Sequence, residues 1–158
     1  MPSVHESRQV AYSADDMYTM VCDVERYPDF LPWCSGARIR KREEVDGRQV
    51  LLADLMVAYK LFREQFTSRV TLNNVERDIS VALVQGPFRH LTNRWTFETL
   101  PDNTCRVHFY LDFEFRNGVL QKLMNGVFAK AFTRMMEAFL ARAEVLYGAK
   151  NLPAPSAI

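Results

Sequence analysis

The 158-residue chain lacks the features that define several classes of protein. Its three cysteines are far apart and include no Cys-x-x-Cys pair, so no disulfide framework is predicted. Its net charge is only +1, whereas a dedicated nucleic-acid-binding domain usually carries a strong basic excess, so DNA is not an expected partner. No apolar run approaches the roughly 20 residues of a membrane-spanning helix. We therefore expect a soluble domain in a reducing compartment.

Motifs of metal, phosphate and acid–base chemistry are also scarce. The histidines His5, His90 and His108 are isolated and show no His-x3-His spacing, so no metal site is predicted. No glycine-rich phosphate-binding loop occurs. Asp54 and Glu64 would be acids of a pocket only if their strands turn them inward, and a surface position is the commoner outcome. We predict that the protein is not an enzyme and has no cofactor.

The length fits a single domain, and the 48% of hydrophobic residues suffices for a core without disulfide or metal staples. We assign residues 1–148 to one ligand-binding domain. The last ten residues, 149–158, contain two prolines and no apolar period, which is typical of a flexible tail.

The first third of the chain predicts one strand and two short helices. The strand is expected over residues 4–12. Ser13 fits the N-cap of a helix that ends near Asp23, because a hydroxyl there accepts a hydrogen bond from the first helical turn. A second helical stretch over 24–33 contains two prolines, which limit it to one or two turns.

Six extended segments follow, separated by turn residues. They are predicted over 37–44, 48–59, 61–72, 79–85, 91–100 and 104–115. Asp46-Gly47 joins the first two of these as a tight hairpin. In the last segment apolar and polar residues alternate strictly, which indicates one buried and one wet face.

From Gly118 to Tyr147 the apolar period becomes helical, which predicts one helix about 45 Å long. A sheet with one apolar face must be covered, and only this helix is large enough to cover it. We therefore predict an α+β fold in which a curved antiparallel sheet of six to seven strands wraps around the C-terminal helix. Because a twisted sheet cannot meet a straight helix along its whole length, a cavity is expected between them.

The residues predicted to line this cavity point to the inward face of their strands or lie on the apolar face of the terminal helix. They are Met56, Phe66, Val70, Leu83, Leu91, Asn93, Trp95, Phe97, Phe109, Leu111, Phe113, Met124, Phe128, Phe132 and Met135. Each would equally serve as ordinary core. The polar residues Ser68 and Gln85 share the same phase. Asn93 would hydrogen-bond a ligand carbonyl, a neighbouring backbone group or a bound water.

Several blocks of the sequence resemble the coenzyme Q-binding START-like proteins. Residues 23–34, Asp-Val-Glu-Arg-Tyr-Pro-Asp-Phe-Leu-Pro-Trp-Cys, are similar to the signature of that family. Residues 63–70 and 86–97 are similar to its further blocks, in the same order, and 112–115 precede the long helix as they do there. The resemblance spans 4–148. It implies a helix-grip fold, an apolar cavity and binding of ubiquinone or a related lipid in support of cellular respiration, without catalysis.

The resemblance also carries alternatives. The same family includes bacterial proteins described as ribosome association toxins, and the wider superfamily includes polyketide cyclases, so a ribosomal partner or a cyclase activity stays open. Mitochondrial members have a targeting presequence that this sequence lacks. The resemblance therefore implies a bacterial protein located in the cytoplasm or peripherally at the inner membrane.

A proline-containing segment within the signature is a candidate cavity lid. A domain of this length is only ~40 Å across, so a long polyprenyl tail must leave it through an opening. A rigid packing corner fits the same segment, since prolines also fix turns. The predicted lid residues are Tyr27, Pro28, Phe30, Leu31, Pro32 and Trp33.

A short basic run, Arg38, Arg40, Lys41 and Arg42, is followed at once by acidic residues that reduce its field. A solvated strand edge is the ordinary interpretation, because charge there discourages strand pairing. The same run would otherwise contact RNA or anionic lipid headgroups.

Overall fold

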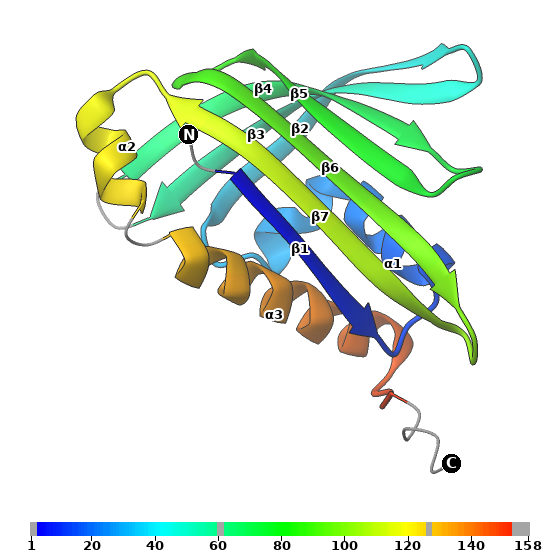
Figure 1. The fold of residues 1–158 in the computed structure, drawn as a ribbon. Helices are drawn as coiled ribbons and strands as arrows, with labels where there is room; N and C mark the ends of the chain where they lie inside the picture. The colour runs from blue at the N-terminus through cyan, green and yellow to red at the C-terminus, as the bar shows by residue number, and fades with distance from the viewer. Residues whose placement is uncertain (1–2, 60–61, 126–127, 153–158) are drawn as a thin grey trace.

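The computed structural model describes residues 3–59, 62–125 and 128–152. Its helices and strands follow the predicted order (Figure 1). They are β1 (Ser3–Val10), α1 (Ala14–Cys22), the 3-10 helix η1 (Val24–Asp29), β2 (Cys34–Val45), β3 (Arg48–Tyr59), β4 (Phe62–Asn73), β5 (Asp78–Gln85), β6 (Phe88–Leu100), β7 (Thr104–Phe115), α2 (Gly118–Asn125) and α3 (Phe128–Tyr147).

The seven strands form one antiparallel sheet in the order β1-β7-β6-β5-β4-β3-β2. From β2 to β7 each strand pairs with the next one along the chain, while β1 pairs with β7, so the first and last strands of the sequence are neighbours in the sheet. The sheet curves over α3, which runs beneath its concave face beside α1 and η1 (Figure 1). This arrangement is the predicted helix-grip, α+β fold.

Local sequence signals explain how several elements begin and end. The Ser13 hydroxyl accepts a hydrogen bond from the Asp16 amide at 3.1 Å, which caps α1 as predicted. Asp46 and Gly47 both have positive φ, 52° and 78°, the conformation that a two-residue hairpin turn requires. Gly148 follows α3 with φ of 85°, a common helix-ending conformation.

The predicted 30-residue terminal helix is wrong, because the structure has two helices, α2 and α3, with residues 126–127 outside the described part of the chain. The two helices pack on different parts of the sheet. Leu120 and Met124 of α2 contact a cluster of aromatic side chains at one end of the sheet, whereas Met136 and Phe139 of α3 enter the main core. A single straight helix would not reach both.

The apolar interior accordingly consists of two clusters. The main cluster lies between the concave face of the sheet, α1 and α3, and Met17, Leu51 and Phe139 are nearly or fully buried in it. The second, which we call the aromatic cluster, has Phe88, Phe113 and Phe115 at its centre, with partly buried side chains packed around it.

Candidate functional site

A cavity of about 170 Å³ lies between the concave face of the sheet, the η1 region and α3. A dry cavity of ~150 Å³ is large enough to bind a benzene ring, so this one admits a ring-sized group without rearrangement. Its lining consists of Val21, Val24, Tyr27, Leu31, Trp33, Ala53, Leu55, Phe66, Ser68, Val70, Ile79, Val81, Leu91, Asn93, Trp95, Phe109, Leu111, Met135 and Phe139.

The register of the sheet explains which side chains reach the cavity. Val70 of β4 pairs with Val81 of β5, which pairs with Asn93 of β6, which pairs with Leu111 of β7. Side chains that lie opposite one another in register point to the same face of a sheet. These residues therefore form one row across four strands, and the curvature of the sheet turns that row toward α3.

Many of the predicted lining residues do line the cavity. They are Phe66, Val70, Leu91, Asn93, Trp95, Phe109, Leu111 and Met135. Both tryptophans of the chain, Trp33 and Trp95, are in the wall. Intrinsic fluorescence should therefore report on whatever occupies the cavity.

Other predicted lining residues lie elsewhere. Leu83, Phe113 and Met124 belong to the aromatic cluster at the end of the sheet, and Phe97 is buried in the main core without reaching the cavity. The side chains of Phe128 and Phe132 lie outside the described residues.

The prediction for Met56 is wrong. Leu51, Ala53 and Leu55 of β3 face the concave side, so Met56 points to the opposite face, where it covers Gly36 of β2. A Cβ atom at position 36 would lie 2.7 Å from the Met56 sulfur, so the glycine makes room for this side chain. Most of residues 48–59 are apolar on both faces of the strand. The sequence therefore lacks the alternation that would show which side chains point to the concave face.

Gln85 was also predicted to face inward, and it is exposed. A β-bulge shifts the pairing of β4 with β5, so that Ser68 lies opposite Leu83 whereas Thr67 lies opposite Gln85. Thr67 belongs to the outer face, where its hydroxyl donates to Asp54. The bulge thus ends the inward row of β5 before Gln85.

Two polar residues, Ser68 and Asn93, interrupt the apolar wall. Asn93 Oδ1 accepts from Trp95 Nε1 at 3.1 Å, and Asn93 Nδ2 donates to the Tyr110 carbonyl at 2.8 Å, so one N–H of this amide is left for another acceptor. Ser68 is 1% exposed and lies in the cavity wall. Both residues therefore place a polar group at the wall of an otherwise largely apolar cavity.

The predicted lid residues lie over one side of the cavity, and Tyr27, Leu31 and Trp33 form part of its wall. Tyr27 and Phe30 pack edge-to-face against Phe139 of α3, with ring centroids 5.6 and 5.2 Å apart. The Arg142 guanidinium lies 5.3 Å from the centroid of the Phe30 ring.

Hydrogen bonds anchor this segment further. Tyr27 donates its hydroxyl hydrogen to the Val21 carbonyl, and the Ala58 amide of β3 donates to the Trp33 carbonyl at 2.8 Å. Pro28 lies within η1, while Pro32 is exposed. This closed position fits both a shut lid and a rigid corner.

No charged side chain is present among the described residues of the cavity wall. Burial raises the pKa of the Tyr27 phenol well above its ordinary value, so the phenol stays neutral. Glu64 is exposed at the surface. The cavity is therefore suited to a neutral, largely apolar ligand.

Asp54 is neither a cavity acid nor an ordinary surface residue. It lies on the outer face of β3 with none of its side chain exposed, and its oxygens accept hydrogen bonds from Arg38 and Arg40 at 2.7 Å each and from Thr67 at 2.6 Å. Burial alone would raise the pKa of Asp54, but these donors outweigh it and lower the pKa to about 2.

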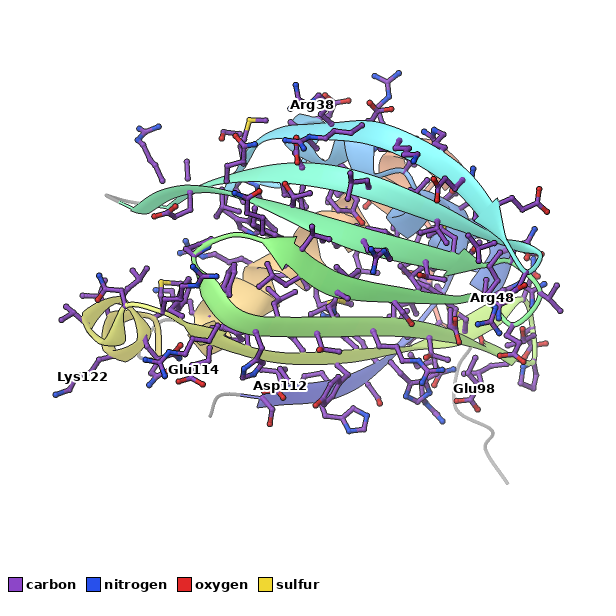
Figure 2. All side chains as sticks on the ribbon, turned by 90° about the horizontal axis from the view of Figure 1, so that it is seen from above. Arg38, Arg48, Glu98, Asp112, Glu114 and Lys122 are labelled. Atoms are coloured by element: carbon purple, nitrogen blue, oxygen red, sulfur yellow. The ribbon has the colours of Figure 1, made fainter. Side chains whose placement is uncertain are left out.

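The basic run of residues 38–42 lies on β2, an edge strand, as the solvated-edge interpretation predicts. Figure 2 shows the outer face of the sheet, with Arg38 projecting from it at the β2 edge. Lys41 contacts Glu43 at 2.6 Å and Arg42 lies 3.7 Å from Glu25, so acidic partners offset these charges too.

His108 lies on the outer face, as its strand alternation predicts. Its Nε2 is 2.9 Å from Glu98 and its Nδ1 is 2.8 Å from the Ser7 hydroxyl. All three cysteines are free thiols. The described residues contain no group of histidine, cysteine and acidic side chains that would hold a metal ion, and none of their helices is long and apolar enough to cross a membrane.

Sequence reasoning missed several wall residues. They are Val21, Val24, Ala53, Leu55, Ile79, Val81 and Phe139. Phe139 was recognisable as part of the apolar helical stripe, but the helix phase that faces the cavity was not. The others lie in short or largely apolar segments, where the sequence pattern does not distinguish a residue of the cavity wall from an ordinary core residue.

Comparison with known proteins identifies relatives along most of the chain. The sequence profile described as "Polyketide cyclase / dehydrase and lipid transport" matches residues 10–140. The ribosome association toxin RatA of Escherichia coli K12 is 37% identical over 150 residues, covering 95% of this chain and 92% of that protein. The mitochondrial coenzyme Q-binding protein COQ10 of Dictyostelium discoideum is 29% identical over 146 residues, covering 92% and 70% respectively.

The fold also has solved counterparts. The solution structure of the 18 kDa protein CC1736 from Caulobacter crescentus superposes with a TM-score of 0.80 at 30% sequence identity. The match covers 94% of this chain and all of that protein. The fold is thus shared with a solved relative, while the sequence relatives carry names from different functional classes.

Proposed function

The chain belongs to the polyketide cyclase, dehydrase and lipid transport family, and from this premise we propose that its cavity binds a prenylated quinone such as ubiquinone, without catalysing a reaction on it. The protein would carry or shield this ligand in support of respiratory electron transport. We place it in the cytoplasm, with peripheral contact to the inner membrane.

The observation that carries the proposal is the composition of the cavity wall. A largely apolar cavity with two polar residues in its wall, Ser68 and Asn93, and no described charge matches a neutral ring that bears carbonyl oxygens. A fatty acid or a phosphate would need a cationic partner, because burying an unpaired charge is strongly unfavourable.

The energetics of an isoprenoid tail are also adequate. Each buried carbon group contributes about 0.8 kcal/mol, so one isoprene unit contributes about 3–4 kcal/mol when it is fully buried. A micromolar complex needs a net of about 8 kcal/mol after the cost of association. A quinone ring and a few isoprene units would therefore suffice, and the rest of a longer tail would extend from the cavity.

The absence of acid–base groups supports a binding role over a cyclase role. General acid–base catalysis needs a titratable group within hydrogen-bond reach of the reacting atom. Among the described wall residues only Tyr27 titrates, and its hydroxyl is already bonded to the Val21 carbonyl. COQ10, a relative whose name states coenzyme Q binding, supports the same reading.

Organic extraction of protein purified from its own host, followed by mass spectrometry, tests this proposal directly. We expect a prenylated quinone in stoichiometric amount. Added quinone should also quench the fluorescence of Trp33 and Trp95, which both line the cavity. Extracts free of quinone, together with fluorescence that does not respond to added quinone, would refute quinone binding.

A ribosome-directed activity is the second candidate, and the RatA name of a 37% identical relative favours it. The double variant Lys41→Glu with Arg42→Glu tests it. Both residues and their acidic partners are exposed, so we expect the fold to tolerate the loss of these ion pairs. If the basic edge contacts ribosomal RNA, the variant should lose salt-sensitive sedimentation with ribosomal subunits. Arg48→Glu, an exposed charge near the turn of the same hairpin, is the control (Figure 2).

A further inference from the structure

We propose that helix α2 is a docking surface for a bilayer that contains anionic lipids, and that an apolar path connects this surface with the cavity. The proposal concerns a surface outside the cavity and does not depend on the identity of the ligand.

Helix α2 exposes large apolar side chains at one end of the sheet. None of its residues is buried, and Val119 and Leu123 are 78% and 66% exposed. These two residues are four apart, so they lie on the same face of the helix. Leu120 and Met124 face the aromatic cluster instead. The apolar side chains of α2 thus point both into the protein and out of it.

One hydrogen bond joins α2 to the sheet, and others stabilise the helix itself. Asn117 Oδ1 accepts from the amides of Val119 and Leu120 at 2.9 and 3.2 Å, which caps the first turn. The Gln121 side chain accepts from the Phe115 amide of β7 at 2.7 Å and donates to Asn125 at 2.8 Å. The outward position of Val119 and Leu123 is therefore a feature of the folded state.

The charge of this part of the chain identifies the partner. Between residues 116 and 136 the sequence has four cations, Arg116, Lys122, Lys130 and Arg134, and no acidic residue, although the whole chain has a net charge of only +1. All four are exposed, and Figure 2 shows Lys122 projecting from α2 away from the sheet.

Val119 and Leu123 share their helix with Lys122 and follow Arg116 closely in sequence, and exposed apolar side chains near cations match the boundary between anionic headgroups and acyl chains. A second copy of the chain is a poorer partner, because a two-fold interface would bring these like charges together. RNA would use the cations but would leave the apolar pair in water.

The surface is continuous with the cavity through apolar contacts. The aromatic cluster that supports α2 also contacts Phe66, Leu91 and Leu111. These three residues are part of the cavity wall. A hydrophobic molecule entering beneath α2 would therefore meet apolar side chains from the membrane boundary to the cavity.

Co-sedimentation of the full chain with vesicles tests the proposal, using phosphatidylcholine alone or mixed with phosphatidylglycerol and no quinone. We expect binding to the anionic vesicles that weakens as salt is added. Val119→Ser with Leu123→Ser should reduce partitioning at least about tenfold, and Lys122→Gln about fivefold. The matched control is Val75→Ser with Val145→Ser, since those valines are 85% and 75% exposed elsewhere on the surface.

The proposal would be overturned by no binding of the native chain to anionic vesicles, by full binding of the Val119/Leu123 variant, or by an equal loss in the control. A change of oligomeric state in the Val119/Leu123 variant would also overturn it, because the face would then be covered by a second copy. Circular dichroism of each variant establishes that it is folded. Since the vesicles contain no quinone, failure here is distinguishable from failure of quinone binding.

Discussion

Asp54 has the most strongly perturbed carboxylate in the described structure. Its folded pKa of about 2 lies below the ordinary value near 3.8. The unfolded chain therefore binds more protons than the folded chain between about pH 4 and pH 2. The stabilisation from Asp54 is complete above that range and is lost as the pH falls through it.

We predict that Asp54→Asn lowers the free energy of unfolding by about 2 kcal/mol at neutral pH, the equivalent of the pKa difference. The deficit relative to the native chain should shrink between pH 4 and pH 2, because the native carboxylate is then protonated as well. Urea denaturation over that pH range measures both quantities. If the difference in the free energy of unfolding stays constant with pH, the ionised form of Asp54 does not stabilise the fold more than the protonated form does.

Ser68 is the residue that best separates ring recognition from burial of the tail. We predict that Ser68→Ala weakens binding of a short-tailed ubiquinone about fivefold, the value of one net hydrogen bond. Binding of a polyprenol without the ring should not change. Fluorescence titration measures both affinities, and Ser80→Ala, an exposed serine of β5, is the control. Equal weakening for both ligands would argue against a bond to the ring.

At the scale of elements, the segment that contains η1 contacts α3 beside the cavity. Tyr27 and Phe30 pack on Phe139, which also contacts Trp95 with ring centroids 5.3 Å apart. The Phe139 ring thus joins this segment, α3 and β6 in one aromatic group. Opening the segment would separate these rings, whereas a rigid corner would keep them together.

Amide hydrogen exchange distinguishes a lid from a corner. The amides of Phe30 and Leu31 both donate to the Tyr27 carbonyl, so they are protected only while the local turn persists. If the segment is a lid, added quinone should slow exchange at Phe30, Leu31 and Trp33. Exchange that quinone leaves unchanged there, while Trp95 fluorescence reports binding, would identify a rigid corner.

At the scale of the whole molecule, the capacity of the cavity is small for a complete lipid. Its volume of about 170 Å³ is below the ~300–1,000 Å³ of a typical drug-sized pocket. A ligand with a long tail must therefore leave most of that tail outside or expand the cavity. The aromatic cluster and α2 offer one apolar exit.

This capacity predicts how affinity depends on tail length. Affinity for a series of quinones should rise steeply with the first one or two isoprene units and then level off, because later units are no longer enclosed. Competition against a fluorescent quinone analogue measures the series. A gain that continues undiminished through longer tails would mean that the protein expands well beyond the structure described.

Strict periodicity in the sequence correctly predicted much of the fold. The alternation over residues 104–115 correctly assigned the inward side of β7, and the Asp46-Gly47 and Ser13 signals correctly placed a hairpin and a helix start. Prediction failed where a segment is apolar on both faces, as for Met56, and where a bulge interrupts the phase, as for Gln85.

The amino-acid sequence by itself determined the order of the elements, the antiparallel sheet and most of the inward-facing strand residues, because those properties follow from periods of two and 3.6 residues that are local to each segment. The tertiary structure alone decided the division of the terminal helical region into α2 and α3, the burial of Asp54 beneath Arg38 and Arg40, and the size of the cavity. Those features depend on sheet curvature and on contacts between residues far apart in the chain, which no local pattern specifies.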